Sequence, residues 1–264
     1  MKQILYLLIF SSLLMASCKT DKSGQNAEKP AQEETAMTKK YTLTPFSPSQ
    51  SFNDAEIKEM SYTNGKFNFD LAEGDYELGV QTSDADQKMC ANSGKGQHIH
   101  LIVGDAPYAA KYTNEFNHDV ADGEHYLLAF LSRSYHESIK TEKAHVAKKV
   151  TVKDKGITEA APIEETMLFY SRPKGTYSGK AETDKVMLDF YPVNAEIGTT
   201  HKVIALINGE EHEITKWQPY YVEGLPLGEN SITLSLVDMD GGKVKAPHNP
   251  VTRKFTLRGD TAER

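Results

Sequence analysis

The sequence has little cysteine and no excess of positive charge, and each shortage excludes a class of protein. Only two cysteines occur among 264 residues, so a framework of several disulfides is excluded. The formal net charge is −7, which argues against a basic nucleic-acid-binding protein. Hydrophobic residues make up 39% of the chain, so it is not an acidic disordered tail and can bury a core in one or two domains.

Two motifs that mark common enzyme classes are also missing. The chain holds no glycine-rich phosphate-binding loop, and it holds no Gly-x-Ser-x-Gly nucleophile elbow. We therefore expect no nucleotide cofactor, and a non-enzymatic protein is the first interpretation. A hydrolase or thiol redox enzyme that uses Cys90 or Ser134 with a histidine stays open as a third alternative.

The first residues have the pattern of a secretion signal. Lys2 is followed by an apolar run from Ile4 to Met15 and by the small residues Ala16 and Ser17, which predicts a signal peptide over 1–17. The run Leu14 to Cys18 resembles a bacterial lipobox, in which the cysteine becomes a lipidated N-terminus. The resemblance implies a bacterial envelope lipoprotein anchored in a membrane through Cys18, in the outer membrane of a Gram-negative cell.

A polar segment separates the lipidation motif from the rest of the chain. Between Lys19 and Lys40 there is no aromatic residue and no Ile, Leu or Val, so this stretch cannot bury enough apolar surface to fold. We interpret 18–40 as the lipidated cysteine and a flexible tether.

From Tyr41 onward the sequence predicts an all-β protein built from two tandem immunoglobulin-like β-sandwiches. Short β-like runs alternate with Gly, Asp, Asn and Pro turns, and no stretch has a sustained helical period. The two halves align at one offset of 105 residues, for example Leu101 to Asp105 with Leu206 to Glu210. The expected parts are a His-rich sandwich over 41–153, a linker over 154–165, a second sandwich over 166–258 and a tail over 259–264.

The first copy differs from the second by an insertion and by a cluster of histidines. About 14 extra residues lie between Val80 and Gly96 and contain Cys90. Six of the nine histidines lie between 98 and 145, and the offset of 105 puts Val203 and Ala205 opposite the first two of them. Binding loops in repeated scaffolds commonly arise by such insertions.

His98 and His100 alternate on a predicted strand, so both rings project from one face. Imidazole with soft sulfur ligands suits copper or zinc, so we expect a transition-metal site. The candidate ligands are His98, His100, His125, Cys90, Met89, His118 and His136. The alternatives are a polar ligand pocket, structural hydrogen bonding by the histidines, and an inert buried Cys90.

Two further polar or aromatic stretches suggest binding without a metal. Arg133, Ser134 and Tyr135 offer a guanidinium beside hydroxyls that can hold an anion, or can satisfy their own backbone. Trp217, Tyr220 and Tyr221 can form a surface for a protein, peptide or glycan partner, or can pack into the sandwich. A metal-free binding module is therefore the second interpretation.

The run Gly96 to Val103, followed by Asp122 to Leu127 and then His136, resembles a group of uncharacterised secreted bacterial domains with a Gly-x-His-x-His-Leu start. The resemblance covers about residues 94–152 and implies a small envelope β-sandwich with clustered histidines, without an established activity. Gln97 stands where another histidine is common in that group. The second copy resembles generic immunoglobulin-like modules of surface lipoproteins.

Overall fold

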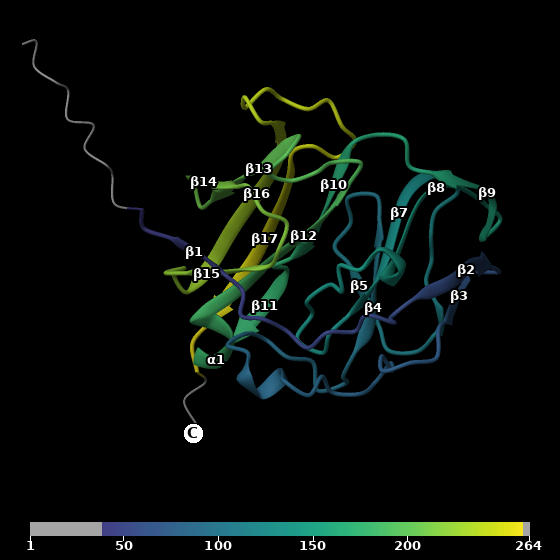
Figure 1. Cartoon of the computed structure of the whole chain (residues 1–264), viewed down its shortest axis with the longest axis horizontal. Coiled ribbons are helices and arrows are strands. Elements are labelled where there is room, and N and C mark those ends of the chain that lie inside the picture. Colours follow the sequence, from purple (N-terminus) through teal and green to yellow (C-terminus); the bar gives the residue numbers. More distant parts are fainter. Residues whose placement is uncertain (1–38, 261–264) are drawn as a thin grey trace, which may run out of the picture. The chain divides into compact units, whose positions relative to one another are not determined.

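A computed structural model describes residues 39–260, and the regular secondary structure of these residues is almost entirely β (Figure 1). Helical segments within this range are single turns: two 3₁₀ turns, η1 (Ala85–Gln87) and η2 (Glu142–Ala144), and one α-helix, α1 (Lys180–Thr183). None of the described helices is long and apolar enough to cross a membrane. The predicted signal peptide, the lipidation site Cys18 and all but the end of the tether lie outside the described residues.

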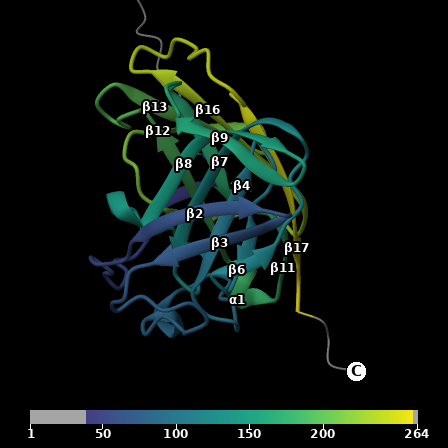
Figure 2. The same cartoon turned by 90° about the vertical axis from the view of Figure 1, so that its right-hand side faces the viewer.

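The first β-sandwich pairs a three-stranded sheet with a five-stranded sheet, and neighbouring strands are antiparallel in both. The smaller sheet has the order β2 (Ile57–Thr63), β3 (Lys66–Leu71), β6 (Glu115–Asn117). The larger has the order β5 (Ala109–Lys111), β4 (His98–Val103), β7 (Gly123–Ser132), β8 (His145–Lys153), β9 (Gly156–Pro162). Figure 2 shows β2 and β3 crossing in front of β7 and β8.

The second β-sandwich has a four-stranded and a five-stranded sheet. The first has the order β1 (Thr42–Pro45), β15 (Tyr220–Glu223), β12 (Lys185–Val193), β10 (Met167–Arg172). The other has the order β11 (Gly175–Ser178), β17 (Val251–Arg258), β16 (Gly228–Asp238), β13 (His201–Ile207), β14 (Glu210–Ile214). The prediction of two immunoglobulin-like sandwiches is confirmed.

Alternating side chains explain why these segments are strands. In β3, Phe67 and Phe69 are buried while Lys66, Asn68 and Asp70 are exposed, the period of two that gives a strand one buried face. The Asn208-Gly209 pair joins β13 to β14, and both residues have positive φ (45° and 91°). Such a pair favours a tight hairpin, as the sequence predicts.

The centre of the large sheet of the first sandwich, formed by β4 and the second half of β7, is buried on both faces. Its inner face holds the core of its own sandwich, including Ile99 and Leu101 from β4. Its outer face packs on the sheet containing β10 and β12 in an apolar interface. That interface contains Ile102, Tyr108, Leu128, Phe130, Ile163, Met167, Phe169 and Tyr191. The two sandwiches therefore share a buried layer, and β4 runs through it.

The offset of 105 residues between the copies correctly relates β7 to β16 and β8 to β17. It is wrong for β4. In the first copy His98 pairs with Ser132, and in the second Lys202 pairs with Val237. Position 132 corresponds to 237 at an offset of 105, so β4 aligns with β13 at an offset of 104. The residue equivalent to His98 is thus Lys202, and not Val203 as the sequence alignment suggests. A shift of one residue exchanges the two faces of a strand, which a run of similar apolar residues does not reveal.

Two predicted boundaries also differ from the structure. The expected linker over 154–165 contains β9, which pairs with β8 after a turn in which Asp154 and Lys155 have positive φ. The start of the expected first sandwich contains β1, which instead pairs with β15 of the second sandwich. Exposed residues dominate β9, so its composition resembles that of a linker.

Candidate metal centre

His98 and His100 lie on the outer face of β4, where the second sandwich covers them. Ile99 and Leu101 point into the core of the first sandwich. Because side chains alternate along a strand, His98 and His100 point the opposite way. Both histidine side chains have 0% exposure. Polar rings in such a place require partners, because an unpaired buried polar group costs free energy.

His136 joins them from the turn that follows β7. The backbone N–H of His136 donates to Arg133 O (2.8 Å), and that of Arg133 donates to Glu137 O (2.9 Å), so the turn is tight. His136 has φ of 70°, a left-handed conformation that is uncommon for residues other than glycine but that histidine, like asparagine and aspartate, adopts more often than most. The turn places the His136 ring on the same face of the sheet as His98 and His100.

Three imidazole nitrogens converge at this point. His98 Nε2 lies 2.9 Å from His100 Nε2 and 2.9 Å from His136 Nδ1, and the last two atoms are 3.4 Å apart. Around one ion with metal–nitrogen bonds of about 2.05 Å, these separations correspond to angles of about 90° and about 110°. An angle of about 110° matches a tetrahedral shell and angles of about 90° match a higher coordination number, and in either case three ligands leave further positions for another ligand.

Hydrogen bonds fix which His98 nitrogen is free. Its Nδ1 lies 2.8 Å from Gly96 O, a carbonyl that only accepts, so Nδ1 carries the proton and Nε2 presents a lone pair. This lone pair can accept one hydrogen bond, yet two histidine nitrogens lie 2.9 Å from it. The three nitrogen–nitrogen contacts among His98, His100 and His136 therefore cannot all be good hydrogen bonds. One cation, in contrast, can accept a lone pair from each of the three nitrogens.

Burial keeps the cluster neutral, the form in which histidine binds metals. Burial lowers the pKa of His98 to about 4. Burial also holds the pKa values of His100 and His136 well below the usual value, with a further contribution from nearby positive groups. The imidazoles therefore keep their lone pairs at neutral pH.

Residues of both sandwiches orient these rings. Ser171 Oγ, from β10 of the second sandwich, lies 3.4 Å from His100 Nδ1. The Tyr108 ring stacks on His100 with centroids 3.7 Å apart and planes 7° apart. Lys174 lies on the other side of this stack, where its Nζ is 4.0 Å from the Tyr108 centroid and donates to Tyr108 O at 2.7 Å. Such outer contacts fix ring orientation in metal sites.

Gly96 is a supporting residue whose role depends on the absence of a side chain. Its φ is 83°, and a Cβ atom would lie 2.4 Å from the backbone carbon and oxygen of Gly79. Only glycine fits there, and its carbonyl accepts the His98 proton. This glycine begins the Gly-x-His-x-His-Leu run, and the sequence pattern alone does not indicate its role. Ser171 and Tyr108 were missed, because their contacts depend on how β4 meets β5 and β10.

The other candidate metal ligands lie apart from this cluster. His125 Nε2 hydrogen-bonds to Ala121 O (2.8 Å) at the opposite end of β7, and His118 lies against Phe67. Met89 is 52% exposed. Cys90 is buried among Ala85, Tyr135, Met187 and Tyr221, and burial raises its pKa to about 11. Among residues 39–260, the cluster that could hold an ion consists of His98, His100 and His136 alone.

The predicted anion site is occupied by the protein's own groups. Arg133 donates from Nε to Gln50 O (2.9 Å) and forms an ion pair with Glu137 (3.5 Å). Ser134 Oγ accepts from the Thr82 backbone N–H, and Tyr135 OH lies 3.4 Å from Asp84 Oδ2. These side chains hold the turn of His136 against the insertion, so we assign them a structural role here.

The predicted aromatic partner surface is packed inside the protein. Tyr220 and Tyr221 are buried, with 9% and 6% exposure. Trp217 is partly buried, donates from Nε1 to Phe190 O (2.9 Å) and packs edge-on against Tyr191. These rings therefore do not form an exposed surface for a sugar or protein.

No protein-family model and no curated protein matches this chain. Among solved structures, it is similar to the fibronectin(III)-like modules of Clostridium thermocellum CbhA, with 15% identity, 36% of this chain and 100% of that chain covered, and a TM-score of 0.29. It is also similar to the central fibronectin-III array of RIM-binding protein, with 10% identity and a TM-score of 0.27; the match covers 82% of this chain and 73% of that chain. A third similar structure is an adhesin that helps an Antarctic bacterium bind ice, with 14% identity and a TM-score of 0.25; the match covers 75% of this chain and 44% of that chain. These scores are low and carry no information about the chemistry of the site.

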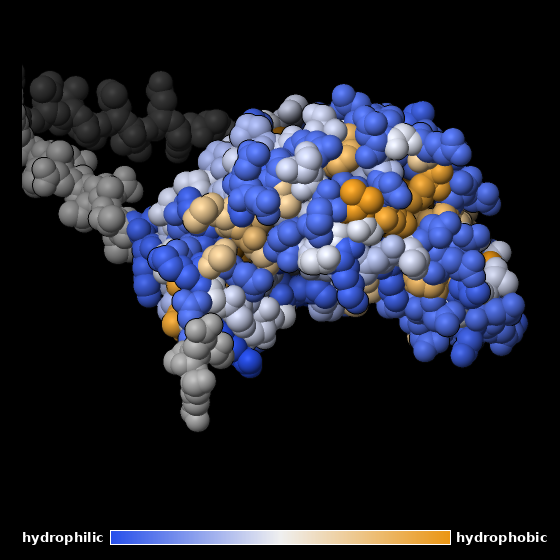
Figure 3. Space-filling view, turned by 90° about the horizontal axis from the view of Figure 1, so that it is seen from below, coloured by the Kyte–Doolittle hydropathy of each residue, from blue (hydrophilic) through white to orange (hydrophobic). Residues whose placement is uncertain are grey.

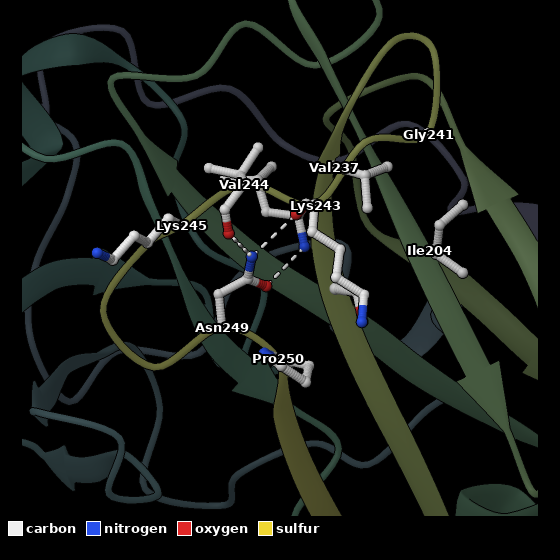
Figure 4. Close-up of a pocket in the computed structure, with 10 residues that line it drawn as sticks. Ile204, Val237, Gly241, Lys243, Val244, Lys245, Asn249 and Pro250 are labelled. Atoms are coloured by element: carbon white, nitrogen blue, oxygen red, sulfur yellow. Dashed lines mark hydrogen bonds between the residues drawn. The ribbon is translucent and has the colours of Figure 1, made fainter.

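The equivalent outer face of the second sandwich has no such chemistry. A cavity of about 520 Å³ lies there, lined by Ile204, which is equivalent to His100, and by Ser235, which is equivalent to Phe130. Figure 4 shows Asn249 holding the loop over it through hydrogen bonds to Leu236 and Val244. The cavity lining contains two lysines but no histidine, cysteine or carboxylate.

The exposed surface of residues 39–260 provides no competing candidate. The face shown in Figure 3 is mainly hydrophilic with small hydrophobic areas. The large hydrophobic side chains exposed within residues 39–260 come from separate elements: Val80, Met89, Leu206, Leu227 and Met239. Single exposed hydrophobic residues of this kind are normal. The histidine cluster is therefore the candidate site.

Proposed function

We propose that this protein binds one transition-metal ion, Zn²⁺ or Cu²⁺, through His98, His100 and His136. The observation that carries the proposal is the convergence of His98 Nε2, His100 Nε2 and His136 Nδ1 within 2.9–3.4 Å of one another. Support also comes from the neutral state of the three rings and from the contacts at Gly96 and Ser171 that orient two of them.

The donor set favours zinc and copper over other common ions. Imidazole nitrogen suits these metals, whereas Ca²⁺ and Mg²⁺ prefer oxygen ligands. Sulfur is not part of this proposal, because Cys90 is a buried thiol with a raised pKa and Met89 lies in solvent. The ligands thus differ from the mixed histidine and sulfur set that the sequence suggests.

We place this function in the bacterial cell envelope. The lipobox-like run ending at Cys18 and the polar segment after it support a lipid anchor, with the folded part tethered to the outer membrane. A binding role is proposed in preference to a hydrolase, because Ser134 is engaged in the turn and Cys90 is buried and protonated. Burial of the Tyr220 and Tyr221 rings weighs against a glycan-binding surface there.

Calorimetric titration of the metal-free protein with Zn²⁺, and separately with Cu²⁺, tests the proposal. We expect about one equivalent to bind to the wild type and none to the variant with His98→Ala and His100→Ala. The matched control is His118→Ala, which removes a half-buried histidine outside the cluster. Equal binding by the wild type and the double variant would overturn the proposal.

A further inference from the structure

Arg172 is a buried cation at the edge of the histidine cluster. It is the last residue of β10 and follows Ser171, whose hydroxyl contacts His100. Its side chain is only 3% exposed. A charged group this deeply buried normally has a carboxylate or several hydrogen-bond acceptors as partners.

The guanidinium of Arg172 has few such partners. Nη2 donates to Tyr177 OH at 2.8 Å, and the guanidinium carbon lies 5.3 Å from the centre of the same ring. Within residues 39–260, Nε and Nη1 have no hydrogen-bond partner, and no carboxylate forms an ion pair with this arginine. Unpaired donors of a buried charge are costly, so the site favours an acceptor that carries negative charge.

The carboxylate of Asp189, opposite Arg172 on β12, is paired with Lys140, and the other groups near this charge are neutral. Arg172 directly follows Ser171, whose hydroxyl lies 3.4 Å from His100 Nδ1. Tyr177 OH, which accepts from Arg172, also accepts from the backbone N–H of Lys174 at 3.2 Å, and Lys174 lies over the Tyr108 ring that stacks on His100. Burial raises the pKa of Cys90 to about 11, so the nearby thiol is uncharged at neutral pH. None of these groups supplies a negative charge to Arg172.

A second cation lies on the same side of the cluster. Lys174 donates to Tyr108 O and lies over the Tyr108 ring that stacks on His100. A divalent metal ion on the three neutral histidines would add two further positive charges. Three histidines also leave coordination positions open, and oxygen anions commonly fill such positions.

We propose that the centre binds a small anion with oxygen donors, a carboxylate or a phosphate, together with the metal ion. One oxygen of this anion ligates the metal, and Arg172 donates to the anion from Nε or Nη1. The inference rests on the proposed metal site, and it adds the chemical class of the second ligand. Arg172 is then a binding residue, and the anion supplies the acceptor that its Nε and Nη1 lack within the protein.

Thermal unfolding and calorimetry of the zinc-loaded protein test the inference, with inorganic phosphate and acetate as the two probes and chloride at equal ionic strength as the reference. We expect at least one probe to raise the Tm of the wild type, and the more effective probe identifies the anion. Arg172→Met is expected to bind one equivalent of zinc, to lose the anion-dependent rise, and to be no less stable than the wild type without anion. Stability is retained because removing an unpaired buried charge is neutral or favourable.

Two further variants complete the design. Arg253→Met removes another arginine of the second sandwich, one that packs over Tyr170, and is expected to keep the anion-dependent rise in Tm. Arg172→Lys keeps the charge and loses the planar donors, so we expect at least tenfold weaker anion binding. This variant serves as the test if Arg172→Met does not fold.

The outcomes separate this inference from the metal proposal. One bound zinc with no effect of either anion on the wild type would overturn the inference and leave the metal site intact. Equal anion effects in the wild type and Arg172→Met would also overturn it. Absence of zinc binding in the wild type would overturn the metal proposal instead.

Discussion

His136 Nδ1 lies 2.9 Å from His98 Nε2, although 38 positions separate the two residues in the chain. The pairing of His98 with Ser132 brings β4 alongside the end of β7, and the tight turn from Arg133 to Glu137 then directs the third ring back over β4. The cluster therefore depends on one strand register and on one turn.

The first prediction distinguishes His136 from His125 as the third ligand. His136→Ala is expected to weaken zinc binding by more than the 10- to 100-fold loss that is typical of changes to outer contacts, since it removes a direct ligand. His125→Ala is expected to leave zinc affinity unchanged, because His125 bonds to Ala121 O at the far end of β7. Competition with a chromogenic chelator measures both affinities, and the reverse ranking would show that the third ligand is wrong.

The second prediction concerns the acid stability of the metal-free protein. Burial lowers the pKa of His98 to about 4, so between about pH 6.5 and pH 4 the unfolded chain binds a proton that the folded protein does not bind. The free energy of unfolding should therefore fall as the pH falls through this range, by up to about 1.4 kcal/mol per pH unit for each such histidine. Urea unfolding at several pH values measures the slope.

The matched control for the pH slope is the variant with glutamine at positions 98, 100 and 136. Glutamine does not titrate, so this variant should lose less stability between pH 6.5 and pH 4 than the wild type. An identical slope in the two proteins would show that other groups cause the acid sensitivity.

The third prediction uses two glycines on one loop. Gly96→Ala would place a Cβ 2.4 Å from the backbone of Gly79 in a residue with positive φ, so we expect it to lower stability by more than about 1 kcal/mol. Displacement of the Gly96 carbonyl should also weaken zinc binding by about 10- to 100-fold. Gly94→Ala is the control, since an added Cβ there meets no atom within 4 Å.

The fourth prediction tests the contact between the sandwiches. Asp189 on β12 has 0% exposure, accepts from the backbone N–H (3.1 Å) and hydroxyl (2.8 Å) of Ser138, and pairs with Lys140 at 2.7 Å. Asp189→Ala leaves these donors without a partner, so we expect a loss of about 3–5 kcal/mol. Asp184→Ala, which breaks the exposed pair with Lys180, should leave the stability almost unchanged.

Urea unfolding followed by tryptophan fluorescence and by circular dichroism measures both aspartate variants. We expect the wild type to unfold in one transition by both probes, because the sandwiches share a buried interface. Equal stability of the two variants, or separate transitions in the wild type, would contradict a structural link through Asp189.

Local pattern was sufficient for part of the fold and for one strand of the site. Alternation along β4 places His98 and His100 on the same face, and the Asn208-Gly209 pair forms the expected hairpin. Both features depend only on neighbouring residues. The all-β class follows from the same kind of information repeated along the chain.

The remaining features depend on contacts distant in sequence. The alternation in β4 does not tell which face of the strand meets the core. The sequence alignment of the two copies also places β4 one residue out of register with β13. The contact of Ser171 with His100 requires the second sandwich to cover the first, for which no motif exists. Cys90 and His125 fit the chemistry of a metal site equally well by residue type, and only their positions separate them from His136.

Anomalous X-ray diffraction from crystals of the zinc-loaded protein is the most direct test of the central claim that three histidines hold one metal ion. The account predicts one strong peak within about 2.0–2.1 Å of His98 Nε2, His100 Nε2 and His136 Nδ1, with no sulfur ligand at about 2.3 Å. A peak at Cys90 or His125, or zinc found on surface carboxylates with the three rings unligated, would contradict it.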